Sequence, residues 1–149
     1  MTISAPERGD YAPSLLSYTE FTGNVSITAT SEATATTIVT APALTFDGAT
    51  GVEIEFFTPD ATLAANAAGN ALVLVLYDGA ASIGFLTQVS TGATTFLDYQ
   101  LRPLRRLTPS AAAHTYSVRG YRSNANCTIN AGVGGLAAFV PGWLKVSRF

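Results

Sequence analysis

Apolar and polar residues alternate along most of the chain, with the two-residue period of β-strands. The clearest case is the segment 52–57, in which Val52, Ile54 and Phe56 occupy every second position. Successive side chains of a strand point to opposite faces, so this segment is expected to bury one face and leave the other polar. The segment 114–123 alternates in the same way and is expected to be another strand.

Turn residues divide this pattern into short strands. The tight turn Asp78-Gly79 is expected to connect strands at 72–77 and 82–89 as a hairpin. The segment 96–107 is expected to be a long strand that Pro103 interrupts. The spacing therefore predicts about eight to ten short strands, with no helix longer than about two turns, in an all-β sandwich or barrel.

Other segments are expected to lack this regularity. Residues 59–70 are rich in Ala, Asn and Gly and are expected to form a loop, and the glycine-rich run 132–135 a flexible connection before a strand at 137–140. Residues 1–16 contain prolines and a glycine that interrupt any regular element, so they are expected to form an extended arm. Residues 17–149 are then expected to form a single domain.

The segment 71–77 is apolar at every position, so neither of its faces suits contact with water. A loop of the same chain or a neighbouring subunit could cover the second face. Only 12% of the residues are charged, against a usual share of about a quarter, and this favours a subunit. We therefore expect a homo-oligomer. The residues expected at its subunit interface are Val73, Val75, Tyr77, Arg105, Arg119 and Tyr121.

The net charge of −2 conceals a division of charge along the chain. Residues 1–98 carry all ten acids and one base, which gives −9, whereas residues 99–149 carry seven bases and no acid, which gives +7. A basic half can mark nucleic-acid binding, but the negative total argues against it. We expect instead that some arginines of the second half meet acids such as Glu53, Glu55 or Asp98, and that several of these contacts cross between subunits or onto a surface to which the protein binds.

Residues suited to catalysis or metal binding are few. The single histidine, His114, follows a turn and is expected to be exposed at the start of a strand, and the single cysteine, Cys127, is expected to be a buried thiol. Glu53 and Glu55 share one face of a strand but are expected to be solvated rather than to act as an acid–base pair. We expect no enzymatic activity, no cofactor and no metal site. No segment approaches the roughly 20 apolar residues of a membrane span.

Several motifs resemble those of small virion proteins of phages and prophages. The turn and strand at 106–110 and 114–119, with the sequences Arg-Leu-Thr-Pro-Ser and His-Thr-Tyr-Ser-Val-Arg, fit that pattern. The closing segment 140–148, Val-Pro-Gly-Trp-Leu-Lys-Val-Ser-Arg, and the earlier segment 43–48 fit it as well. The match covers roughly residues 14–149. The resemblance implies a jelly-roll sandwich of the tumour-necrosis-factor/C1q type, a homotrimer and a place in the virion.

Two roles in a phage particle are compatible with this resemblance. A decoration protein would bind the exterior of the head, with residues 1–16 attaching it to the major capsid protein. A tail-fibre or spike component would bind a receptor or glycan on the host surface. The chain has a short arm and no long shaft, so we expect decoration, with the protein made in the host bacterial cytoplasm and located in the virion. A carbohydrate-binding module or an enzyme is the remaining alternative.

Overall fold

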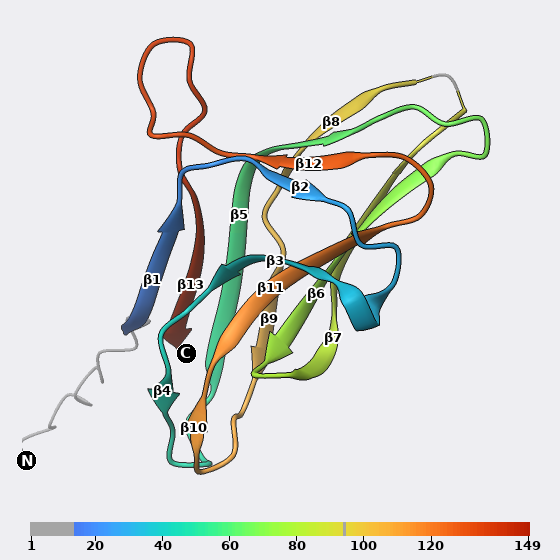
Figure 1. Cartoon of the computed structure of the whole chain (residues 1–149). Coiled ribbons are helices and arrows are strands. Elements are labelled where there is room, and N and C mark those ends of the chain that lie inside the picture. Colours follow the sequence, from blue (N-terminus) through green and yellow to red (C-terminus); the bar gives the residue numbers. More distant parts are fainter. Residues whose placement is uncertain (1–13, 94) are drawn as a thin grey trace, which may run out of the picture.

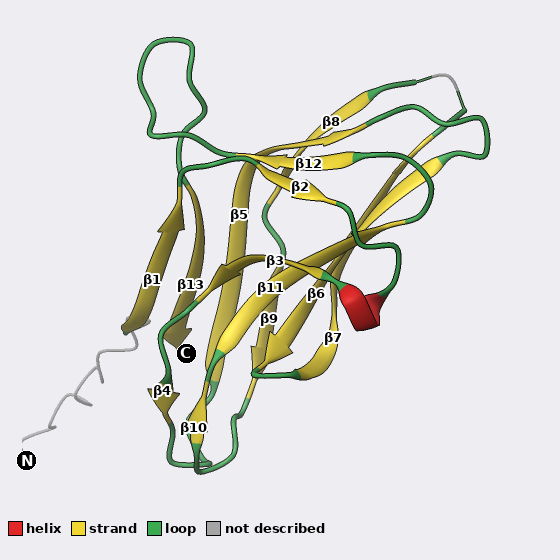
Figure 2. Ribbon diagram, in the orientation of Figure 1, coloured by secondary structure: helices red, strands yellow, loops and turns green. Residues whose placement is uncertain are grey.

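The computed structural model describes residues 14–93 and 95–149, which fold into an all-β domain (Figures 1 and 2). Its strands are β1 (Leu15–Phe21), β2 (Val25–Ile27), β3 (Thr36–Thr40), β4 (Leu44–Thr45), β5 (Val52–Leu63), β6 (Asn70–Asp78), β7 (Ala81–Thr91), β8 (Leu97–Leu101), β9 (Leu104–Leu107), β10 (Ala113–His114), β11 (Tyr116–Arg122), β12 (Cys127–Asn130) and β13 (Gly142–Arg148). The only helix in the described chain is the single 3-10 turn η1 (Glu32–Thr34), so none could cross a membrane.

The larger sheet has seven strands and is built around β5. Its main order is β1-β13-β5-β12-β2, and β8 and β9 pair with the other edge of β5. The first half of β5 lies between β13 and β9, and the second half lies between β12 and β8. Strands from the two ends of the sequence therefore lie side by side.

The smaller sheet has four strands in the order β3-β11-β6-β7. The predicted hairpin is confirmed: β6 and β7 are antiparallel neighbours, and the chain turns between them at Asp78 and Gly79. Gly79 has a φ of +56°, in the left-handed region that a glycine adopts without steric cost. A separate ribbon of β4 and β10 closes one end of the molecule.

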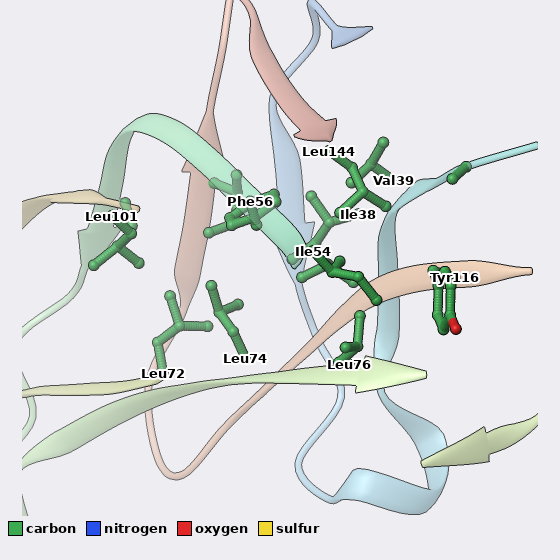
Figure 3. Close-up of a cluster of buried hydrophobic side chains, with 14 of the residues drawn as sticks. Ile38, Val39, Ile54, Phe56, Leu72, Leu74, Leu76, Leu101, Tyr116 and Leu144 are labelled. Atoms are coloured by element: carbon green, nitrogen blue, oxygen red, sulfur yellow. The ribbon is translucent and has the colours of Figure 1, made fainter. Parts of the chain in front are cut away.

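The two sheets share one hydrophobic core (Figure 3). Alternate residues of β5 point into it, and Ile54 and Phe56 are fully buried. Leu72, Leu74 and Leu76 of β6 are fully buried on the other side of the same core. Burying each such side chain contributes about 1.5–3 kcal/mol, so the alternation seen in the sequence is what joins the sheets.

Strand β5 is longer than predicted. It continues through Pro59 to Leu63, where a loop was expected from residue 59. Between Thr58 and Ala61 the register against β8 shifts by one residue, so Pro59 lies in a bulge. A proline is tolerated in a bulge because no regular ladder hydrogen bond is required of it there. The loop of this region is confined to residues 64–69.

Two other boundaries differ from the prediction. Residues 137–140 form no strand, because Ala137 has a φ of +61° and two preceding glycines also have positive φ values, which is incompatible with an extended chain. Strand β1 begins at Leu15, two residues before the expected domain boundary. The rest of the expected arm, residues 1–13, lies outside the described residues.

Candidate functional site

The second face of β6 is buried within one chain. Val73, Val75 and Tyr77 are 7%, 0% and 5% exposed and form a small cluster of their own outside the main core. Ala35, which follows η1, packs against this cluster, as does Tyr121 of the neighbouring strand β11. The alternative that the sequence left open, a covering segment of the same chain, is therefore the one observed.

Polar contacts hold this cover in place. The Tyr77 hydroxyl donates a hydrogen bond of 2.7 Å to the backbone carbonyl of Glu32. The Arg119 guanidinium lies 4.1 Å from the centre of the Tyr77 ring and donates to the carbonyl of Gly79 at 2.7 Å. Arg119 and Tyr77 thus find their contacts within one chain, and the apolar second face of β6 is covered without a partner subunit.

Arg105 is also engaged within the chain. It lies on β9, at the edge of the larger sheet, and its guanidinium occupies the space that a Cβ atom of residue 84 would fill on β7, at the edge of the smaller sheet. A side chain at position 84 would collide with it, and the φ of Gly84 is +126°. The Arg105 side chain therefore lies between the neighbouring edges of the two sheets.

The outer surface of the larger sheet, on the opposite side of the molecule, exposes several apolar side chains. Side chains that alternate with the core residues of the larger sheet form its outer surface, which we call the aromatic face. Three of its apolar members are well exposed: Leu15 (60%), Tyr18 (48%) and Leu104 (52%). The members of the aromatic face are Leu15, Tyr18, Glu53, Glu55, Phe57, Arg102, Leu104, Arg106, Trp143 and Lys145.

Three aromatic rings form a row across neighbouring strands of this face. The Trp143 ring lies 5.8 Å from Tyr18 of β1 and 5.5 Å from Phe57 of β5, measured between ring centres. Trp143 and Phe57 are direct partners in the sheet register. The Arg102 guanidinium and the Lys145 ammonium lie 5.6 and 5.5 Å from the Trp143 ring, within cation–π range.

Glu55 is an almost buried carboxylate within this face. Its side chain is 7% exposed and forms ion pairs with Arg102 and Lys145. Burial alone raises the pKa of Glu55, but the hydrogen bonds and charges of Lys145 and Arg102 outweigh it, so the net pKa is lowered. Glu55 is thus a stable anion that holds two cations beside the aromatic row, rather than the solvated carboxylate expected from the sequence.

A third ion pair on the aromatic face joins Arg106 of β9 to Glu53 of β5. Arg106 donates from Nε to Glu53 at 2.9 Å. The expectation that arginines of the second half meet Glu53 and Glu55 is therefore confirmed within one chain. Asp98, the third acid named, instead accepts a hydrogen bond from the Thr62 hydroxyl at 2.8 Å. The guanidinium groups of Arg102 and Arg106 remain largely in solvent, with side chains 63% and 62% exposed.

His114 lies in a cluster that the sequence did not indicate. It was expected to be exposed, but its side chain is only 12% exposed, and Nδ1 forms an ion pair with Asp78. Its Nε2 lies 3.2 Å from the Ser110 hydroxyl and 3.1 Å from the Ser110 carbonyl oxygen. The hydrogen bond with Asp78 is the main cause of a raised His114 pKa.

This Asp–His–Ser set resembles a nucleophilic triad in its connectivity, but its hydrogen bonds favour another role. The carbonyl oxygen of Ser110 can only accept, so Nε2 carries a proton toward it and is not available as a base for the hydroxyl. With both ring nitrogens donating, the imidazolium ties the loop before β10 to the β6–β7 turn. We interpret the role of the cluster as structural, because it connects two loops.

Cys127 and the other residues suited to catalysis or metal binding form no further candidate site among the described residues. Cys127 is fully buried on β12, as predicted, and burial raises its pKa. Among the residues that the structure describes, no three His, Cys, Asp or Glu side chains are grouped so that they could hold a metal ion. Two surface cavities, of about 440 and 280 Å³, have charged residues in their walls: Glu32 and Arg119 in the first, Asp47 and Arg148 in the second.

The aromatic face is therefore the strongest candidate for a functional surface in the described chain, because it combines exposed apolar groups with ordered charges. Comparison with known proteins assigns it no role: no protein-family model matches the chain, and no curated protein shows significant similarity to it.

Proposed function

We propose that the chain is a structural subunit of a bacteriophage particle, which assembles as a homotrimer and decorates the exterior of the head. The fold proposed with it is a jelly roll. The strand order supports this fold: β1-β13-β5-β9 lies on one side of the core and β3-β11-β6-β7 on the other. Along the chain, β3, β5, β6–β7, β8–β9, β11 and β13 fall alternately in the two sheets, as the Greek-key connections of a jelly roll require.

The observation that carries the assembly part of the proposal is the composition of the aromatic face. Tyrosine, tryptophan and arginine are the residues that dominate binding energy in protein interfaces, and here they lie together with exposed leucines. A second copy of the chain is an occupant that is present whenever the protein is made.

The same geometry makes a sugar a poorer occupant of this face. The ring planes of Trp143 and Phe57 are inclined by only 25° at a centre separation of 5.5 Å, so the rings stack on one another. Arg102 and Lys145 flank the Trp143 ring. The faces of the Trp143 ring against which a sugar would stack are therefore occupied by Phe57 and the two cations.

The proposed place of the subunit in the particle rests on the resemblance of its turn and strand motifs to those of phage virion proteins. Attachment to the major capsid protein through residues 1–16 remains part of the proposal, and residues 1–13 lie outside the described part of the chain. Mass spectrometry of purified particles tests it through copy number. Many copies per particle are expected for decoration, whereas a few would assign the chain to the tail.

Assembly is tested with a matched pair of variants on exposed aromatic residues. Tyr18 lies on the aromatic face, whereas Phe85, 60% exposed, lies on β7 of the other sheet. Tyr18→Asp is expected to convert the full-length trimer to monomer in analytical ultracentrifugation at micromolar concentration, and Phe85→Asp to leave it a trimer. A monomeric wild type, or identical behaviour of the two variants, would overturn the proposed assembly.

A further inference from the structure

The larger of the two surface cavities, of about 440 Å³, lies between η1 and the β6–β7 hairpin. Its volume falls in the range of about 300–1,000 Å³ that small-molecule sites occupy. Segments far apart in the sequence build its walls, which contain one acid and one base. The residues of these walls are Glu32, Ala33, Tyr77, Ala80, Ser82 and Arg119.

The Arg119 guanidinium supplies the positive charge of the cavity and is held in place by its own chain. Its Nε donates to the Ser117 hydroxyl at 3.3 Å, and its Nη2 donates to the carbonyl of Gly79 at 2.7 Å. Ser117 is 2% exposed, so this anchor belongs to the interior of the protein. A guanidinium has five N–H donors, and the other three have no partner among the described residues. Their planar arrangement suits a carboxylate.

The Glu32 side chain supplies the negative charge. Its backbone is fixed, because its carbonyl accepts hydrogen bonds from the Tyr77 hydroxyl at 2.7 Å and from the N–H of Ala35 at 3.1 Å. Within the described part of the chain, its carboxylate forms no ion pair with Arg119 or with any other base. The cavity therefore presents a carboxylate and a guanidinium that do not neutralise one another.

The smaller cavity, of about 280 Å³, lacks this arrangement although it also has an acid and a base in its walls. Its acid, Asp47, already accepts hydrogen bonds from the backbone N–H groups of Ala49 and Thr50 at 2.8 and 2.7 Å, and from the Thr50 hydroxyl at 2.7 Å. The Asp47 carboxylate thus caps its own turn, whereas the Glu32 carboxylate is left for a ligand.

A ligand that displaces water from the larger cavity has to compensate both charges. A neutral ligand would desolvate the carboxylate and the guanidinium without replacing their hydrogen bonds, and a ligand with one charge would leave the other unpaired. We propose that this cavity binds a small zwitterion of the amino-acid or short-peptide class, whose carboxylate pairs with Arg119 and whose ammonium pairs with Glu32. The methyl groups of Ala33 and Ala80 contact its apolar body.

Titration with three related peptides tests this charge pattern in the full-length protein. Alanyl-alanine carries both charges, N-acetyl-alanyl-alanine lacks the ammonium, and alanyl-alanine amide lacks the carboxylate. Alanyl-alanine is expected to shift the amide NMR signals of the cavity residues saturably, with a Kd of about 1 mM or lower. Each peptide that lacks one charge is expected to bind at least about 10-fold more weakly, because it loses one set of charge-assisted hydrogen bonds.

Glu32→Gln tests the acid without disturbing the fold. It removes the carboxylate but keeps the backbone carbonyl that binds Tyr77, so the thermal midpoint is expected to stay unchanged while alanyl-alanine binds at least about 10-fold more weakly. N-acetyl-alanyl-alanine is expected to bind this variant as it binds the wild type. Glu20→Gln is the matched control, because Glu20 is exposed on β1 of the other sheet, and it should leave binding unchanged.

Three results would overturn the proposal. The first is the absence of saturable shifts at the cavity with about 10 mM alanyl-alanine, and the second is equal binding of all three peptides. The third is an equal loss of binding in Glu32→Gln and Glu20→Gln, which would mean that the peptide is attracted by the net charge alone. The inference goes beyond the proposed function and does not depend on the trimer, whose existence ultracentrifugation measures separately.

Discussion

Val75 separates two explanations for the apolar second face of β6. It is fully buried in a single chain, in the cluster with Val73 and Tyr77. Val75→Ala removes two methyl groups, which cost about 0.8 kcal/mol each in lost burial, and the cavity left behind adds a further term. We expect the free energy of unfolding to fall by about 2–3 kcal/mol. Val75→Asp would bury a charge and is expected to prevent folding, since total stability is only about 5–15 kcal/mol.

Urea unfolding followed by the fluorescence of Trp143, the only tryptophan, measures this change. Protein concentration has to be held constant, because the stability of an oligomer depends on it. Val133→Ala is the matched control: Val133 is 80% exposed in the loop between β12 and β13, so the same deletion should change the free energy of unfolding by less than about 0.5 kcal/mol.

The reasoning would be refuted by a specific combination of results. If Val75→Ala left the urea midpoint unchanged but converted the oligomer to monomer, a partner subunit rather than the segment around Ala35 would cover the second face of β6. If Val75→Ala and Val133→Ala lowered the free energy of unfolding equally, the difference in burial between the two positions would have no energetic consequence.

Three further predictions concern polar groups. Tyr116→Phe should raise the free energy of unfolding by about 1 kcal/mol, because the buried hydroxyl has no hydrogen-bond partner among the described residues; a lower thermal midpoint would contradict this. Asp78 raises the pKa of His114, so the stability that wild type gains over His114→Gln should be complete below about pH 6.5 and disappear as pH rises through the folded-state pKa; a pH-independent difference in urea midpoint would refute it. Glu55 has a lowered pKa, so Glu55→Gln should lower the free energy of unfolding by about 1–2 kcal/mol at neutral pH, and this cost should diminish below the unfolded-state pKa of about 4.3 and vanish as the pH falls through the lower folded-state pKa; an undiminished cost in acid would argue against the ion pairs with Arg102 and Lys145.

Local sequence patterns predicted most of the strands. The features that they did not predict depend on contacts between residues far apart in the sequence. The alternation at 52–57 and the Asp78-Gly79 turn gave β5 and the β6–β7 hairpin, because both depend on neighbouring residues. The continuation of β5 through Pro59 depends on a bulge opposite β8, about 40 residues away, and no local pattern indicates it. The cover of Val75 depends likewise on the segment after η1, which only the folded topology brings to β6.

The charge division along the sequence illustrates the same limit. The acidic half and the basic half were expected to attract one another, and the topology shows how they meet: β5, which carries Glu53 and Glu55, is flanked by β9 and β13 of the basic half. The register then selects the pairs, since Lys145 is the direct partner of Glu55 and Arg106 that of Glu53.

Only some of the arginines were expected to meet acids, and the others use different acceptors. Arg119 binds a carbonyl and a tyrosine ring, and Arg122 donates to the carbonyls of Ile27 and Asn124. Backbone carbonyls carry no sequence signal, so composition alone overestimates how many arginines need acids. The charge division is therefore evidence for how the larger sheet of a single chain holds together.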